Sequence, residues 1–251
     1  MTESNISIPS GELTLQGTLN VSGPTPGPAA LLISGSGPID RDSNTKRLPI
    51  DVMHQIADHL GSNGVTSLRY DKRGVGESDG DYLTAGFDDN IDDARAAITA
   101  LRTRPDVDAD QVFVIGHSEG ALIASALAAD ERLAGVALLA GAAVNGRDVL
   151  EWQAQQVAPT LPTPVKWLMK LLRQDLVRTQ SKRLDRIASS TDDVIRVQLV
   201  KLNAKWFREF MAFEPTRALR TAAVPVLAIT GTKDIQVNPD DVALMGQAVA
   251  T

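Results

Sequence analysis

The sequence predicts one α/β domain whose sheet is mainly parallel, with antiparallel strands at its amino end and an inserted helical cap. Three observations indicate this fold. Apolar runs of strand length alternate with helical patterns, the first 20 residues alternate between apolar and polar positions, and a late segment shows helical patterns alone. The 251 residues suffice for one core with an insertion. We assign residues 1–144 and 222–251 to the core and 145–221 to the cap.

The opening segment predicts a hairpin, because apolar residues alternate on both sides of Ser10-Gly11. The apolar run 29–33 suits a strand buried on both faces, and the glycine-rich segment 34–38 follows it. Strand and helix then alternate, which favours right-handed crossovers. The expected elements are a helix over 50–60, a strand over 65–70, a helix over 91–101, strands over 111–115 and 136–139 around a helix over 121–129, and a strand over 224–230.

The cap segment contains all three tryptophans. Its last helix places Trp206, Phe210 and Phe213 at positions i, i+4 and i+7, an aromatic stripe. Such a stripe most often seats a helix on its neighbour, and that interpretation is favoured. The alternative is that Trp206 and Phe210 line a substrate site.

Composition and charge exclude several classes of protein. The chain has no cysteine, so it has neither disulfides nor thiolate metal sites. A net charge of −6 argues against a nucleic-acid partner. We expect no membrane span and no signal peptide, hence a cytoplasmic protein. Residues 166–208 hold 11 Lys and Arg against 4 Asp, which indicates a solvated helical face rather than steering of an anionic substrate.

The sequence G-H-S-E-G at residues 116–120 matches the nucleophile-elbow pattern G-x-S-x-G. It stands directly after an expected strand and before an expected helix of small residues. In such a turn the serine backbone is strained and its hydroxyl is presented at the carboxyl end of the sheet. Ser118 is therefore the candidate nucleophile.

Acyl transfer also requires donors for the oxyanion of the tetrahedral intermediate. The backbone amide of Glu119, next to the nucleophile, is one candidate. The second should come from the loop after the third strand, where the amide of Ser36 is favoured and that of Gly37 is the alternative.

The acid of a catalytic triad follows the nucleophile in this chain order. Asp234 stands just past the last expected strand and is the candidate. Asp71 precedes the nucleophile, and we expect it to be a structural partner of Arg73 in its own loop.

With these motifs the chain resembles the α/β-hydrolase superfamily, and within it bacterial serine esterases with a G-S-G-P-x-D-R-D loop, present here at residues 35–42. The segment 70–78, Y-D-K-R-G-V-G-E-S, is similar to the loop after the fourth strand in that family. The resemblance implies a carboxylesterase with a helical cap, acting without cofactor or metal. Ser43 departs from it, since glycine is expected there.

The histidines depart from the resemblance further. His117 adjoins the nucleophile and should point away from it, while His54 and His59 fall on the helix after the oxyanion loop. None fits the catalytic base. Residues 238–241 form a helix start, and the sequence ends within that helix without a stop signal. We expect the catalytic histidine beyond residue 251 and the 251 residues alone to be inactive.

The sequence thus predicts a serine hydrolase that cleaves small-molecule carboxylic esters through an acyl-enzyme. A thioesterase, acyltransferase or peptidase would use the same parts. A non-catalytic protein that binds a ligand or partner through the cap cleft is the alternative from another class. Oligomeric state and acyl preference stay open.

Overall fold

The computed structural model describes residues 2–249 except 24, 46, 165–166, 168–174 and 198. A seven-stranded sheet has the order β1-β2-β4-β3-β5-β6-β9. Its strands are β1 (Thr2–Ser10), β2 (Leu13–Val21), β3 (Gly27–Ile33), β4 (Thr66–Tyr70), β5 (Val107–His117), β6 (Gly135–Leu139) and β9 (Val226–Ile229). The pairs β1·β2 and β2·β4 are antiparallel and the others are parallel, as the alternation of elements predicts.

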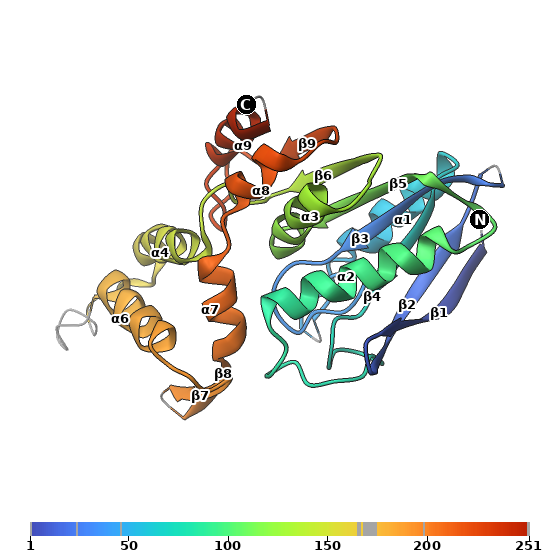
Figure 1. The fold of residues 1–251 in the computed structure, drawn as a ribbon. Coiled ribbons are helices and arrows are strands. Elements are labelled where there is room, and N and C mark those ends of the chain that lie inside the picture. Colours follow the sequence, from blue (N-terminus) through green and yellow to red (C-terminus); the bar gives the residue numbers. More distant parts are fainter. Residues whose placement is uncertain are drawn as a thin grey trace.

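Helices cover both faces of this sheet (Figure 1). On one face lie α2 (Phe87–Arg102) and α3 (Glu119–Asp130), and on the other lies α1 (Val52–Ser62). Further along the chain, α8 (Pro215–Thr221) packs against α3 and against α9 (Asp241–Val249).

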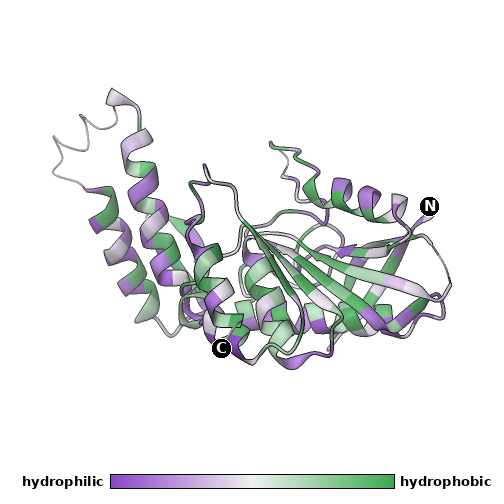
Figure 2. Cartoon of the chain, turned by 90° about the horizontal axis from the view of Figure 1, so that it is seen from above, coloured by the Kyte–Doolittle hydropathy of each residue, from purple (hydrophilic) through white to green (hydrophobic). Residues whose placement is uncertain are grey.

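The position of β3 in the middle of the sheet explains why residues 29–33 are all apolar. Leu31 and Ile33 belong to the large core under α2 and α3, whereas Leu32 packs with Met53 and Ala57 of α1. Because side chains alternate along a strand, a strand with a helix layer on each side needs apolar residues at every position. Figure 2 shows the resulting contrast between the apolar strands and the mixed helices of the inserted segment.

The segment inserted between β6 and β9 is not purely helical, which corrects the sequence expectation. It contains α4 (Gly146–Val157), the 3₁₀ turn η1 (Ala158–Thr160), α6 (Leu176–Ala188), α7 (Ala204–Ala212) and α8. Between α6 and α7 lies a hairpin of β7 (Val194–Val197) and β8 (Val200–Asn203). Its turn places Leu199 at φ 71° and has none of the Gly or Asn residues that usually mark such turns, so the sequence pattern missed it.

The aromatic stripe seats α7 on the core, as favoured from the sequence. Phe210 and Phe213 contact Phe87 at the start of α2, with ring centroids 5.9 and 5.2 Å apart. Phe213 follows the last residue of α7.

None of the helices that the structure describes is long and apolar enough to cross a bilayer.

Candidate active site

Ser118 occupies the strand-to-helix turn that the sequence predicts. β5 ends at His117 and α3 begins at Glu119, so Ser118 is the residue between them. Its backbone has φ 56° and ψ −116°, in a region that residues with a Cβ rarely adopt. Its N–H donates to the Leu139 carbonyl at 2.9 Å, which ties the turn to the end of β6. Such strain at a single half-buried serine is typical of a nucleophile elbow.

The two glycines of the elbow are required by close backbone approach. A Cβ at Gly116 would lie 1.9 Å from the Gly120 carbonyl oxygen, and one at Gly120 would lie 2.2 Å from the Ile33 carbonyl oxygen. Either contact would force the backbone apart. The spacing G-x-S-x-G is therefore a packing requirement of this turn as well as a signature.

The loop after β3 lies against the nucleophile. A Cβ built on Gly35 would be 3.3 Å from the Ser118 Cβ, so this loop approaches the serine directly. Neither the Ser36 amide nor the Gly37 amide donates a hydrogen bond to another described residue. Both amides are therefore free to bind a substrate oxygen, as an oxyanion site requires.

A small cavity of about 50 Å³ opens at Ser118. Ser36 and Glu119 line it together with Ser118, and most of its remaining wall is apolar. The other lining residues are Leu122, Ala140, Ala142, Val149, Leu150, Gln153, Trp206, Phe210 and Val237. The structure thus brings together the serine, two residues whose amides are oxyanion candidates, and the two aromatic residues that the sequence offered as substrate-lining.

A buried charge network behind the nucleophile was missed by sequence reasoning. The Glu119 side chain is only 1% exposed and pairs with Lys72 at 3.1 Å. It also accepts hydrogen bonds from Asn90 Nδ2 at 3.0 Å and Trp206 Nε1 at 2.6 Å. Lys72 Nζ donates at 2.6 Å to the carbonyl of Gly35. The nucleophile turn and the oxyanion loop are therefore held by the same ion pair.

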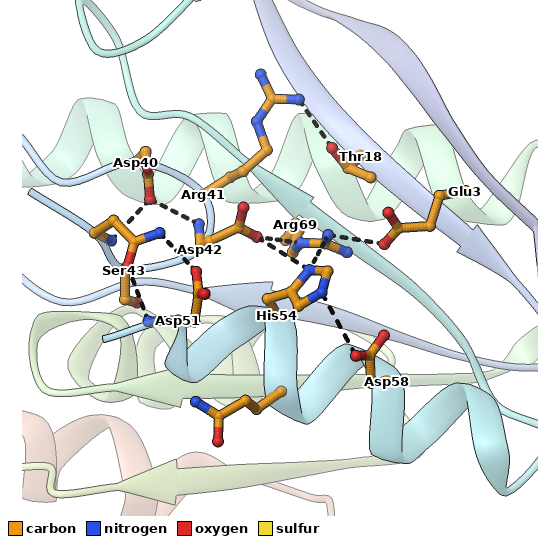
Figure 3. A network of polar contacts seen from close by, with 12 residues as sticks. Glu3, Thr18, Asp40, Arg41, Asp42, Ser43, Asp51, His54, Asp58 and Arg69 are labelled. Carbon is orange, nitrogen blue, oxygen red and sulfur yellow. Dashed lines mark hydrogen bonds and ion pairs between the residues drawn. The ribbon is translucent and has the colours of Figure 1, made fainter. Parts of the chain in front are cut away.

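Further charged groups fix the rest of the 34–44 loop. Asp42 pairs with the buried guanidinium of Arg69, which also bonds Glu3 at 2.8 Å (Figure 3). Ser43 is buried and has φ 68°, a backbone conformation that glycine adopts more readily. This explains why a glycine is expected there. The Ser43 hydroxyl donates to Ser34 Oγ at 3.2 Å, a bond that glycine could not make.

The expected pairing of Asp71 with Arg73 is wrong. Asp71 accepts the Arg41 guanidinium at 2.6 Å and the Arg41 backbone N–H at 2.7 Å, so it holds the oxyanion loop. It also accepts the Glu77 N–H of its own loop at 3.5 Å. Arg73 instead makes a two-bond pair with Asp93, at 2.7 and 2.9 Å, and contacts Asp89. Both residues lie beyond the end of β4, where the chain turns, so strand geometry does not keep their side chains on one face.

Asp234 lies in a turn after β9, on the same edge of the sheet as Ser118. Its Oδ1 accepts the N–H groups of Gln236 and Val237 at 2.7 and 3.0 Å. Its Oδ2 accepts no hydrogen bond from the part of the chain that the structure describes. Val237 lines the Ser118 cavity, so this turn adjoins the nucleophile. A carboxylate with one oxygen fixed and one open can orient a histidine.

Asp234 lies near enough to His117 for its charge to act on the pKa of that histidine. Burial lowers the pKa of His117, while the negative charge of Asp234 acts to raise it. The His117 Nδ1 atom is buried and has no hydrogen-bond partner among the described residues. His117 is therefore neutral at pH 7 and contributes no fixed positive charge beside the nucleophile.

His54 belongs to the structural network around Arg69 and does not line the Ser118 cavity. Arginine can only donate, so the bond of 2.8 Å from Arg69 to His54 Nδ1 leaves the imidazole proton on Nε2, facing Asp58 at 3.5 Å (Figure 3). Glu3, His54 and Asp58 have potential metal-ligand atoms within 4.8 Å of one another. The Arg69 guanidinium already bonds two of them, and its positive charge disfavours a cation there.

Comparison with known proteins agrees with this geometry. The family model described as serine aminopeptidase, S33, matches residues 50–251. Esterase EstD from Thermotoga maritima is 29% identical over 220 residues, which cover 87% of this chain and 49% of the relative. The chain thus spans about half the length of that curated relative.

Solved structures show the same fold. Est1E from Butyrivibrio proteoclasticus, with ferulic acid bound, has a TM-score of 0.69 at 18% identity over 97% of this chain and 85% of its own. The α/β hydrolase GrgF from Penicillium sp. sh18 has a TM-score of 0.68 at 17% identity, over 99% of this chain and 86% of its own. At these identities the likeness establishes the α/β-hydrolase fold.

Proposed function

Because the chain belongs to the serine aminopeptidase S33 family of α/β hydrolases, we propose that it is the core of a serine hydrolase that cleaves carboxylic esters of small molecules. The observation that carries this proposal is the strained backbone of Ser118 at the mouth of a cavity that Ser36 and Glu119 also line. A strained serine that lines a cavity next to free amide donors is suited to acyl transfer. The likeness to EstD favours an ester over other acyl substrates.

In the proposed reaction the Ser118 hydroxyl attacks the ester carbonyl and passes its proton to a base. The carbonyl oxygen becomes an oxyanion, which accepts hydrogen bonds from the amides of Ser36 and Glu119, with Gly37 as the alternative to Ser36. The C–O bond to the alcohol then breaks, and the leaving alkoxide takes the proton. Water attacks the resulting acyl-enzyme by the reverse sequence of steps and restores Ser118.

Asp234 supplies the acid of the triad in this proposal, with its open Oδ2 oriented toward a histidine. None of His54, His59 and His117 lines the Ser118 cavity. The base is therefore the one component that these residues do not provide. The segment 145–221 forms the cap, and its residues Trp206 and Phe210 contact the substrate from α7.

The decisive test uses the protein expressed from the complete reading frame. It should react with a fluorophosphonate probe and hydrolyse p-nitrophenyl esters, and Ser118→Ala should abolish both, a loss of at least about 10³-fold. Ser125→Ala is the matched control, since Ser125 is buried within α3 and its hydroxyl donates to the Leu122 carbonyl at 2.7 Å, away from the cavity lining.

Two outcomes would contradict the proposal. Labelling that persists in Ser118→Ala would place the nucleophile elsewhere. A well-folded protein that neither labels nor hydrolyses any ester would indicate a ligand-binding protein. An amino-acid p-nitroanilide in the same panel tests for the peptidase activity named in the family description.

A further inference from the structure

We infer that Trp206 is a specificity-determining residue, whose indole ring is held by Glu119 as the wall that limits the size of the apolar group an ester can place beside Ser118. This inference rests on the proposed function. It names the substrate class more narrowly, as esters with a short apolar group on the side that enters the cavity.

Two independent contacts hold the indole of Trp206. Its Nε1–H donates to Glu119 Oε1 at 2.6 Å, and a hydrogen bond to a carboxylate is among the stronger ones in proteins. Its ring stacks on Phe210 with centroids 4.6 Å apart and an interplanar angle of 13°. One contact fixes an edge of the ring and the other fixes a face, so the ring cannot rotate without losing both.

The acceptor of this bond is itself fixed in the core. The carboxylate of Glu119 is also bound by Lys72 and Asn90, and its side chain is 1% exposed. Moving it would leave a buried ammonium group without its counter-charge, which is strongly unfavourable. Trp206 is thus attached to the residue that follows the nucleophile, and not only to the rest of α7.

The amino end of α7 is held in the same way. The Trp206 N–H donates to Asn203 Oδ1 at 2.9 Å, which caps the helix. The Asn203 amide group in turn donates to the carbonyls of Tyr82 and Ala85 at 2.7 and 2.6 Å. The backbone that carries Trp206 is therefore tied to the core loop before α2.

The cavity that this wall bounds is small. At about 50 Å³ it is well below the roughly 300–1,000 Å³ of a typical small-molecule site. A short alkyl group fits within such a space. A longer chain would have to displace the indole and break the bond to Glu119.

The experiment measures kcat/KM on p-nitrophenyl esters from acetate to octanoate, and on acetate esters of alcohols from methanol to octanol. For the wild-type protein, kcat/KM should fall with chain length in at least one of the two series. Trp206→Ala should raise the ratio of long to short substrate in that series by about 10-fold or more, because pocket space for added methylenes changes specificity by that order. The series that responds shows whether the acyl or the alcohol group occupies the cavity.

Two further variants isolate the parts of the inference. Trp206→Phe keeps an aromatic ring but removes the N–H donor, so it should raise the same ratio by less than Trp206→Ala does. Trp167→Ala is the matched control, because Trp167 is 65% exposed and lies outside the cavity, and it should leave the ratio at the wild-type value. Thermal unfolding checks each variant, and Trp206→Leu replaces Trp206→Ala if the latter does not fold.

The outcomes separate this inference from the proposed function. A wild-type protein that hydrolyses no ester contradicts the proposed function. Hydrolysis with a chain-length profile that Trp206→Ala leaves unchanged in both series overturns the role of Trp206 alone. A Trp206→Phe ratio equal to that of the wild type overturns the role of the Glu119 bond.

Discussion

The two loops that meet at the candidate site are held in different ways. The loop after β3, residues 34–44, is fixed by buried ion pairs and by Lys72, which bonds the Gly35 carbonyl. The loop after β9, residues 230–238, is shaped mainly by its own turn at Asp234. A bond from Gln153 to the Gln236 carbonyl at 2.8 Å links it to α4.

The position of each strand in the sheet accounts for this difference. β3 lies between β4 and β5, with a helix layer on each side. β9 is the outermost strand on its side among the residues that the structure describes; it pairs with β6, and its Leu227 and Ile229 are 56% and 52% exposed. The core therefore fixes the nucleophile and its amide donors in advance. The Asp234 side chain, in contrast, is held by the N–H groups of its own turn.

The largest expected effect on stability comes from removing the Arg41–Asp71 ion pair, which holds the loop of residues 34–44. Asp71→Asn should lower the free energy of unfolding by about 3 kcal/mol, because the largely buried Arg41 guanidinium loses its near counter-charge and keeps only the exposed Glu77 at 3.8 Å. Urea denaturation measures this. The control Asp110→Asn disrupts an exposed pair with Arg132, of 69% and 84% side-chain exposure, and should cost less than about 1 kcal/mol. Equal losses would show that the first loop is not held by this pair.

The next effect concerns the strain at the nucleophile. Ser118→Gly should be more stable than Ser118→Ala by about 1 kcal/mol, since glycine adopts φ 56° without strain while its greater backbone entropy offsets part of the gain. Both variants lack the hydroxyl, so the comparison isolates the backbone. Thermal unfolding of the two variants measures it. An alanine variant that is at least as stable would mean that the turn is unstrained.

A smaller effect on stability is expected in the loop of residues 230–238. Asp234→Ala should lower the free energy of unfolding by about 1 kcal/mol, because it removes the acceptor of two N–H groups at a half-buried position. Asp234→Asn keeps an oxygen in the same place and should stay close to the wild type. If Asp234→Ala costs as much as Asp71→Asn, the two loops are equally anchored and the contrast between them fails.

The smallest effect is a shift in the titration of His117, which measures the coupling between the loops. Burial lowers the pKa of His117 from its usual value of 6.5, and Asp234 partly opposes that change. Asp234→Asn should therefore lower this pKa further in an NMR titration, whereas Asp240→Asn should have a weaker effect. An unchanged pKa in Asp234→Asn would show that the charge of Asp234 does not reach the elbow.

The same lowered pKa predicts how stability changes with pH. A histidine whose pKa is lower in the folded state binds its proton first in the unfolded state as the pH falls. The contribution of His117 to stability is therefore fully present above pH 6.5 and declines as the pH falls from 6.5 toward its folded pKa. His117→Gln should remove this part of the pH dependence of the melting temperature.

Local patterns in the sequence were enough to predict the succession of core strands and helices along the chain and the elbow at residues 116–120. The run 29–33 and the motif 116–120 specify their structures through neighbouring residues alone, because periodicity and glycine placement act over a few positions. The same holds for the turn at Asp234. The hairpin of β7 and β8 was missed because its turn lacks the residues that normally signal one.

Tertiary structure alone decided which charges meet. Asp71 pairs with Arg41 rather than with Arg73, two positions away, and Glu119 binds Trp206 from a helix 87 positions later. Periodicity carries no information about such pairs, because they depend on how distant segments are brought together at one edge of the sheet. The buried carboxylate of Glu119 needs donors wherever the fold can supply them, and Lys72, Asn90 and Trp206 supply them from three separate segments.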